Sequence, residues 1–183
     1  MAIEGDEAGL VAGLHHDDPD ALAALFDRYA DRLYNHCFRA TADWAEAEDA
    51  VSAVFLEVWR HRHRVQLHDG SALPWLYGVA TNVCRNLTRS RRRRTRALAA
   101  LPQPAAEPDH AERVTDRLGS TARMQEVLEA VRALPARERE VLALVAWAGL
   151  TYEQAAAALE VPVGTVRSRL SRARARLSTG ENA

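Results

Sequence analysis

The chain has 183 residues, of which 48% are hydrophobic and 27% charged, and its formal net charge is -1. This length suffices for two small domains, and the low aromatic share together with many alanines favours helices over strands. No apolar run reaches the roughly 20 residues that a membrane-spanning helix needs, and the acidic N-terminus lacks the order of a signal peptide. We therefore expect an all-α protein of the cytoplasm, without insertion into a membrane.

The near-neutral charge hides a strong asymmetry along the chain. Residues 1–50 contain a large excess of Asp and Glu over Arg, whereas residues 70–106 contain no acid and include the run Arg91 to Arg94. Residues 161–180 are also free of acids and rich in Arg. Arginine suits bidentate contacts to phosphate and guanine. Two separate basic segments therefore predict two contacts with a polyanion.

Three helices are predicted in the first domain, residues 19–96. The first begins at Asp18 and Pro19, where Asp18 can accept a backbone hydrogen bond and Pro19 suits the first helical position. Apolar residues then recur at helical spacing in this segment, in a second segment from about Asp43 and in a third from about Ala72. The acidic composition of residues 1–18 favours a disordered N-terminal tail.

A linker is predicted at residues 97–121, because this stretch has little hydrophobic periodicity and three prolines. The prolines are Pro102, Pro104 and Pro108. The chain thus divides into two small helical domains joined by a flexible linker.

The second domain, residues 122–178, ends in a predicted helix-turn-helix. Thr151 and Gln154 have the spacing of a capping box at the start of a short Ala-rich helix. A turn around Pro162 then leads into a longer basic helix, residues 163–177. A short helix, a tight turn and a longer basic helix are typical of a DNA-binding helix-turn-helix.

The side chains of that last helix suit a major groove. Arg167, Ser168, Ser171 and Arg172 recur at helical spacing from its N-terminal end. The alternative is an ordinary solvated face, but such a face mixes both signs of charge, and residues 161–180 contain no acid. In the third helix, Trp75 either stacks on unpaired bases or packs in the core.

Residues for catalysis are not apparent. The histidines show no HExxH or other ligand spacing, and Cys37 and Cys84 are far apart without a CxxC motif. Glu46, Glu48 and Asp49 lie near a predicted helix start, where carboxylates commonly stay solvated and favour the helix dipole. We therefore expect no enzyme activity, no metal site and no cofactor.

Four segments carry further information, and in chain order they are residues 47–59, 74–82, 134–141 and 161–174. They resemble segments of the extracytoplasmic-function (ECF) sigma factors of the sigma-70 family, and their order and spacing agree from about Asp20 to Leu177. The first resembles the polymerase-docking helix, the second the promoter-opening helix, and the last two the C-terminal DNA-binding region.

The resemblance implies two contacts with core RNA polymerase. The second helix would dock on the clamp helices of the largest subunit, and the C-terminal domain would contact the flap of the second-largest subunit. The implied docking residues are Glu48, Asp49, Ser52, Phe55 and Trp59. A sequestering anti-sigma factor is a further expected partner, because this arrangement is common in the family.

The resemblance also implies two contacts with promoter DNA. The first domain would open the minus-10 element, and the loop of about residues 64–72 would bind a base flipped out of the duplex. Its DNA-binding residues would be Trp75, Asn82, Arg85, Arg89 and Arg92. The last helix would read the minus-35 element through Thr165, Arg167, Ser168, Ser171 and Arg172, with Thr165 near a phosphate.

Two other interpretations compete with this one. A helix-turn-helix regulator of the response-regulator type would need a phosphoacceptor domain of alternating strands and helices, a pattern that the N-terminal half does not show. A protein-binding adaptor would account for the acidic half and would leave both basic segments unexplained.

Overall fold

The computed structural model describes residues 7–41, 44–99, 129–131 and 133–180, and within these ranges the regular structure is helical. The only β pairing there is an isolated bridge between His68 and Ser71. The prediction of an all-α protein is confirmed. In chain order the elements are α1 (Glu7–His15), α2 (Pro19–Thr41), α3 (Trp44–Arg60), the 3-10 turn η1 (Arg62–Arg64), α4 (Leu73–Ala99), α6 (Ala136–Leu142), the π-helical turn η2 (Ala143–Trp147), α7 (Tyr152–Leu159) and α8 (Val163–Gly180).

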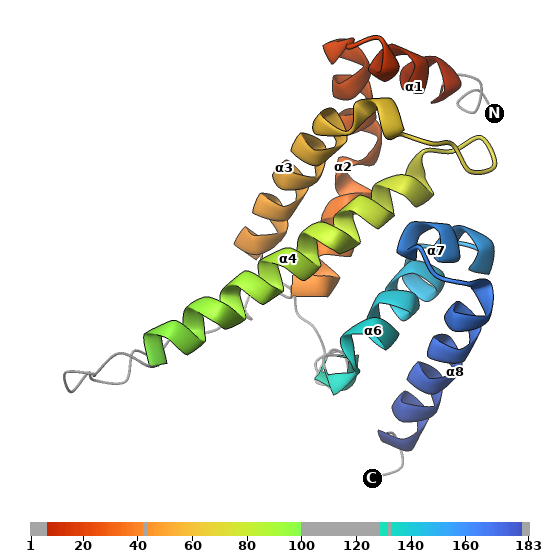
Figure 1. Cartoon of the computed structure of the whole chain (residues 1–183). Coiled ribbons are helices and arrows are strands. Elements are labelled where there is room, and N and C mark those ends of the chain that lie inside the picture. Colours follow the sequence, from red (N-terminus) through yellow and green to blue (C-terminus); the bar gives the residue numbers. More distant parts are fainter. Residues whose placement is uncertain (1–6, 42–43, 100–128, 132, 181–183) are drawn as a thin grey trace.

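Helices α2, α3 and α4 pack together as the first domain (Figure 1). Each contributes the apolar stripe that the sequence predicts, with Leu33, Val54 and Leu76 fully buried between them. The start of α2 also follows the prediction, because Asp18 Oδ1 accepts the backbone N–H of Asp20 at 2.9 Å. Burial of these stripes is the main favourable contribution to the folding of the domain.

The N-terminal segment corrects a prediction. Residues 7–15, expected to belong to a disordered tail, form helix α1, which packs against α2. Glu7, Val11 and Leu14 are buried and recur at helical spacing, and a Cβ on Gly13 would lie 2.8 Å from that of Ala21. The acidic composition misled the prediction because one of the acids, Glu7, is itself inside the fold.

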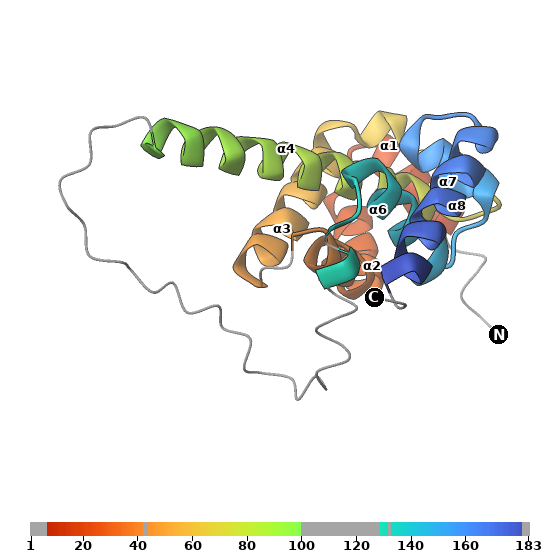
Figure 2. The ribbon, with the colours of Figure 1, turned by 90° about the horizontal axis from the view of Figure 1, so that it is seen from below.

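Helix α4 is the longest element and includes the arginine run. Its first part packs on α2 and α3, and its last turns extend beyond the other helices (Figures 1 and 2). The helix continues to Ala99, so the first three residues of the predicted linker, 97–99, are helical. The remainder of that linker, residues 100–121, lies outside the described residues.

The C-terminal helices form the predicted helix-turn-helix. Thr151 Oγ1 accepts the backbone N–H of Gln154, and the Gln154 side chain accepts that of Thr151, so the capping box is confirmed. Helix α7 ends at Leu159, the next residue Glu160 has left-handed backbone angles, and α8 follows after Pro162. Val166, Leu170 and Ala173 bury the inner side of α8 against α6 and α7.

The two helical groups lie against each other, with α7 packed on α4 (Figure 1). The contact is closest at Gly78 of α4, where a Cβ would lie 2.6 Å from the carbonyl oxygen of Ala158. A glycine is therefore required at position 78, where α4 meets the second domain. A second contact between the helical groups joins the Arg39 guanidinium to the ring of Trp147, 5.4 Å from the ring centroid.

A buried histidine joins α2 to α4. The His36 ring nitrogen Nε2 lies 3.1 Å from Thr81 Oγ1, and the ring packs edge-on against Tyr77 at 5.1 Å. Burial lowers the pKa of His36 from 6.5 to about 4, and the nearby Arg39 adds to the effect. The imidazole is therefore neutral in the folded protein at neutral pH.

The lowered pKa of His36 predicts that the free energy of unfolding falls in mild acid. The folded pKa of His36 lies below the unfolded value, so the contribution of the neutral ring is complete above pH 6.5 and is lost as the pH falls toward 4. In urea titrations, the free energy of unfolding should drop between pH 7.5 and 4.5 by about 2 kcal/mol more in the wild type than in His36→Gln. Equal losses in both proteins would contradict this account of His36.

Candidate nucleic-acid interface

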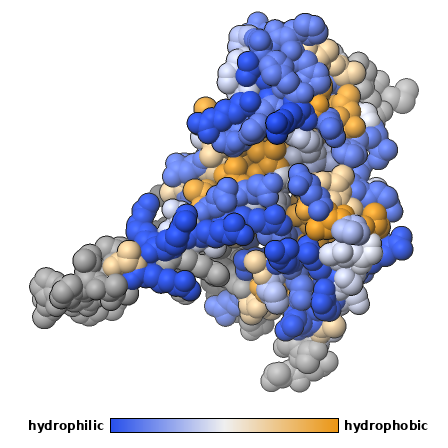
Figure 3. Space-filling view, in the orientation of Figure 1, coloured by the Kyte–Doolittle hydropathy of each residue, from blue (hydrophilic) through white to orange (hydrophobic). Residues whose placement is uncertain are grey.

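One side of α4 carries the predicted DNA-contacting residues of the first domain. Asn82 and Arg89 are exposed, whereas Trp75 and Arg85 are half-buried. Hydrophilic side chains dominate the visible surface along this helix (Figure 3). The side chain of Arg92 lies outside the described residues. Helix α4 thus brings at least two exposed polar candidates onto a basic surface.

Arg85 is already bound to a carboxylate of the second domain. Its Nε and Nη2 atoms donate to the two carboxylate oxygens of Glu140 in α6, at 2.6 and 2.5 Å. The third donor, Nη1, reaches the side-chain oxygen of Asn82 at 3.0 Å. The Glu140 carboxylate raises the pKa of Arg85. A carboxylate of the same chain therefore binds Arg85 in a bidentate manner, and Arg85 in turn binds Asn82, the neighbouring predicted DNA-binding residue.

The exposed side of α8 carries the predicted groove-contacting residues. Arg167, Ser168, Ser171 and Arg172 are all exposed, and Thr165 is half-buried near the start of the helix. The Ser168 hydroxyl donates to the Thr165 carbonyl at 3.1 Å. Because the opposite side of α8 is buried in the domain, these side chains face away from it. Such an arrangement is suited to insertion of α8 into a groove.

A buried carboxylate anchors α8 from behind. Glu138 of α6 is 7% exposed, and its oxygens lie 3.1 Å from Arg176 Nε and 3.9 Å from Arg172 Nε. Since the side chains of both arginines remain more than half exposed, Glu138 leaves the positive charge of α8 accessible to a polyanion.

The predicted polymerase-docking residues of α3 fall into two groups. Glu48, Asp49 and Ser52 are exposed and form an acidic, polar surface. Phe55 is only 6% exposed, because it packs against Phe26 of α2 with ring centroids 4.8 Å apart. The family resemblance implies a docking role for Phe55, and in the free chain its side chain is buried.

Trp59 and two residues that sequence reasoning missed complete this region. Trp59 is half-buried beneath the guanidinium of Arg62, which lies 4.6 Å from its ring centroid. Phe26 is 44% exposed and Leu56 61% exposed, although both have large apolar side chains. Phe26 directly follows Leu25 in α2, and Leu25 is fully buried. The sequence alone does not show which of two neighbouring apolar residues on a helix faces outward.

The loop between α3 and α4 ends in a tight turn. His68 and Ser71 exchange two backbone hydrogen bonds of 2.8 and 3.0 Å, and the residues between them, Asp69 and Gly70, have positive φ angles of 53° and 78°. Asp and Gly favour a two-residue turn of this kind. The predicted base-binding loop therefore presents a defined backbone at its tip.

The described part of the chain contains no group of three or more His, Cys, Asp or Glu that could hold a metal ion. Cys37 and Cys84 are buried, and a hydrogen bond with Cys37 together with burial raises the pKa of the Cys84 thiol. A neutral, buried thiol is a poor nucleophile. None of the described helices is long and apolar enough to cross a membrane.

Comparison with known proteins assigns the helices that carry the two candidate DNA-binding surfaces, α4 and α8, to two regions of one protein family. Residues 25–94 match the family profile of sigma-70 region 2, and residues 124–177 match that of sigma-70 region 4. The chain belongs to the sigma-70 family of RNA polymerase sigma factors. Its relatives place this sigma factor in the ECF group, so that the predicted family and the predicted role in promoter recognition are confirmed.

Two curated relatives illustrate the similarity. The ECF RNA polymerase sigma factor SigE of Mycolicibacterium smegmatis is 34% identical over 84% of this chain, which covers 58% of that relative. RNA polymerase sigma factor HrpL of Pseudomonas syringae is 33% identical over 72% of this chain, which covers 71% of it.

Two solved structures share the fold. The sigma factor RpoE of Bartonella quintana, solved with the anti-sigma factor NepR, has a TM-score of 0.68 at 23% identity, covering 88% of this chain and 96% of RpoE. CnrH, solved with the cytosolic domain of CnrY, has a TM-score of 0.67 at 25% identity, covering 95% of both chains.

The close approach at Gly78 predicts a variant that separates the two domains. Gly78→Ala should favour α4 as a helix, but its Cβ would collide with the Ala158 carbonyl, so α7 must move away. Small-angle scattering should show a larger radius of gyration for this variant. The matched control is Gly164→Ala in α8, where nothing lies within 4 Å of the new Cβ and no change is expected. A wild-type radius in Gly78→Ala would contradict the described packing.

Proposed function

We propose that this sigma factor docks on core RNA polymerase through α3 and reads a promoter at two places, with α4 at the minus-10 element and α8 at the minus-35 element. The observation that carries this proposal is that each of the two matched regions presents exposed polar side chains on the helix to which the family resemblance assigns DNA contact. The chain would act in the cytoplasm as an initiation factor without enzyme activity of its own.

At the minus-35 element, α8 would lie in the major groove of intact duplex. The Arg167 and Arg172 side chains can donate to guanine or to phosphate, and Ser168 and Ser171 can contact base edges or backbone. The buried Glu138 and the apolar inner side of α8 fix the angle at which these side chains leave the domain. Rigid support of this kind makes base readout by short side chains feasible.

At the minus-10 element, the loop and α4 would bind an opened strand. A flipped base would enter the loop, Asn82 would help to read it, and Trp75, Arg85, Arg89 and Arg92 would hold neighbouring nucleotides. Flipping costs a few kcal/mol in lost stacking and pairing, so the pocket must return that energy selectively for the correct base. The defined turn at Asp69 and Gly70 supports a pocket of fixed shape.

Docking on the polymerase would use the exposed side of α3. Glu48, Asp49 and Ser52 would face the clamp helices of the largest subunit, beside the exposed apolar side chains of Phe26 and Leu56. A small apolar centre surrounded by charged residues is a common composition for a protein interface. The second domain would contact the flap of the second-largest subunit.

Promoter binding would require the two domains to separate. In the free chain, Glu140 binds the Arg85 guanidinium, which also donates to Asn82, and α7 packs on part of α4. Duplex minus-35 DNA and opened minus-10 DNA are distinct sites, and the polymerase would set the spacing between the domains that bind them. We therefore expect the free protein to bind promoter DNA weakly.

An anti-sigma factor is a proposed partner. RpoE of Bartonella quintana and CnrH, which share this fold, were solved in complexes, the former with an anti-sigma factor and the latter with the cytosolic domain of CnrY. A protein that binds across both domains would stabilise their contact and keep the sigma factor from the polymerase by mass action.

Run-off transcription with purified core polymerase tests the two DNA roles. On a promoter selected from a random library, Asn82→Ala should reduce discrimination against substituted minus-10 bases, and Arg172→Ala against substituted minus-35 bases, each by about tenfold. Asn35→Ala, an exposed position on α2, is the control and should retain both preferences. If either variant lost both the minus-10 and the minus-35 base preference, the assignment of roles would be overturned. The same would follow if neither the wild type nor the variants initiated transcription.

A further inference from the structure

The loop between α3 and α4, residues 61–72, is bonded near both of its ends to the N-terminal helix α1 and the turn after it. We propose that α1 is a positioning element for this loop, with one anchor at the loop start, His15 and Asp17, and one at the loop end, Glu7. The inference rests on the proposed function, in which the loop receives the flipped minus-10 base, and it names the residues that fix the shape of that pocket.

The loop-end anchor is a buried carboxylate. Glu7 is 5% exposed, and its Oε2 accepts the backbone N–H of Ala72 at 2.6 Å. Its Oε1 accepts the hydroxyl of Tyr29, and Arg28 Nη2 lies 3.6 Å away. A carboxylate is costly to bury unless it is paired, and here both of its oxygens have partners.

The bond from Glu7 ends at the start of α4. Ala72 directly precedes the first residue of α4, where backbone N–H groups have no partner within the helix. A negative charge at this place also interacts favourably with the helix dipole. Ser71 Oγ accepts the next N–H, that of Leu73, at 3.2 Å. Glu7 therefore caps α4 from 65 residues away and fixes where the loop ends.

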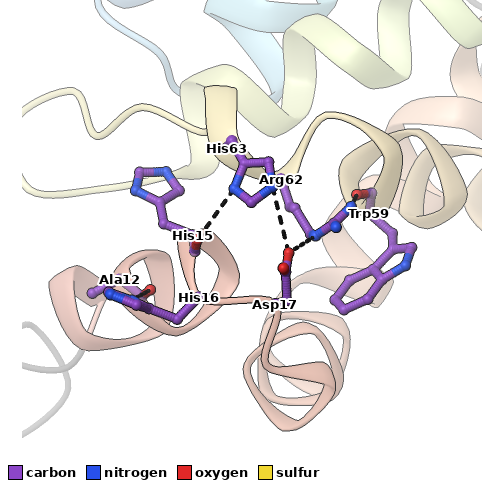
Figure 4. A network of polar contacts seen from close by, with 7 residues as sticks. All are labelled: Ala12, His15, His16, Asp17, Trp59, Arg62 and His63. Carbon is purple, nitrogen blue, oxygen red and sulfur yellow. Dashed lines mark hydrogen bonds and ion pairs between the residues drawn. The ribbon is translucent and has the colours of Figure 1, made fainter.

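The loop-start anchor is a set of polar contacts from the end of α1 (Figure 4). The His15 ring donates from Nε2 to the carbonyl of Val65 at 3.2 Å, and His63 Nδ1 donates to the carbonyl of His15 at 3.1 Å. The Asp17 carboxylate pairs with Arg62, which lowers its pKa, and lies 3.4 Å from the His63 ring.

The same anchor reaches the end of α3. Arg62 Nη1 donates to the Trp59 carbonyl at 2.9 Å while its guanidinium covers the Trp59 ring (Figure 4). Between the two anchors Gln66, Asp69 and Gly70 are exposed, and Asp69 Oδ2 accepts a hydrogen bond from Gln154 Nε2 of α7 at 3.1 Å. The loop thus has fixed ends and an exposed tip that α7 contacts in the free chain.

Fixed ends matter for binding a flipped base. Ordering a loop upon binding reduces the free energy available for recognition, and a loop that is already held loses less. Base flipping itself costs a few kcal/mol, so a loosened pocket should lose selectivity before it loses affinity for the polymerase. Because the described polar contacts of Glu7 reach α2 and the start of α4, we expect its removal to leave the docking side of α3 in place.

The test uses the full chain, core polymerase and a library-selected promoter on which the wild type initiates. The measured quantity is the ratio of initiation rates with the preferred flipped base and with a substituted base. Glu7→Ala should lower this ratio about tenfold. It should leave core affinity unchanged in fluorescence anisotropy, and should speed hydrogen exchange at residues 65–72 relative to α3.

His15→Ala and His16→Ala are a matched pair that keeps the test independent of folding. The His16 ring bonds only within α1 among its described contacts, to the Ala12 carbonyl at 2.7 Å, whereas the His15 ring reaches the loop. His15→Ala should lower the base-discrimination ratio, and His16→Ala should retain the wild-type ratio.

The outcomes separate the two hypotheses. If the wild type initiates and discriminates while Glu7→Ala and His15→Ala keep its ratio, the positioning role is overturned and the sigma assignment stands. If His15→Ala and His16→Ala lose the ratio equally and in parallel with thermal stability, α1 acts only as general support, and the proposal is also overturned. If the wild type initiates at no promoter, both the proposed function and this inference fail.

Discussion

Helix α4 is packed on two sides at once, and the other features of the molecule depend on this constraint. Leu76 and Ala80 are fully buried, and α2 and α3 pack on the helix within the first domain. On another side α7 approaches so closely that only glycine fits at position 78. The remaining exposed surface carries Asn82 and Arg89, which we assign to promoter DNA. One helix is thus a core element, a domain interface and a candidate DNA-binding surface.

The ion pair of Arg85 and Glu140 connects these roles. It is bidentate and mostly shielded from solvent, with 29% and 14% of the two side chains exposed. Breaking it without a replacement would leave a partly buried charge unpaired, which is costly. In the proposed function a DNA phosphate would offer Arg85 an equivalent partner, so exchanging one anion for the other would not be costly once the polymerase holds the domains apart. The domain contact and DNA binding would therefore compete for the same guanidinium.

Local signals made much of the fold predictable from sequence. The cap at Asp18, the capping box of Thr151 and Gln154 and the apolar stripes act within a few residues, and the structure confirms them. The features that were missed depend on distant partners. Glu7 is buried because of a backbone N–H 65 residues away, and Arg85 pairs with Glu140 across 55 residues. Which of two apolar neighbours faces outward, as with Phe26, is decided only by packing between helices.

The distance between α4 and α8 tests most directly whether this sigma factor opens when it engages a promoter. Spin labels at Ser90→Cys and Arg174→Cys would sit on exposed positions, and the native cysteines are buried. Pulsed electron–electron double resonance should give one short distance between the two labels in the free protein. After addition of core polymerase and promoter DNA, the distance should be longer. An unchanged short distance in a complex that initiates transcription would contradict the account.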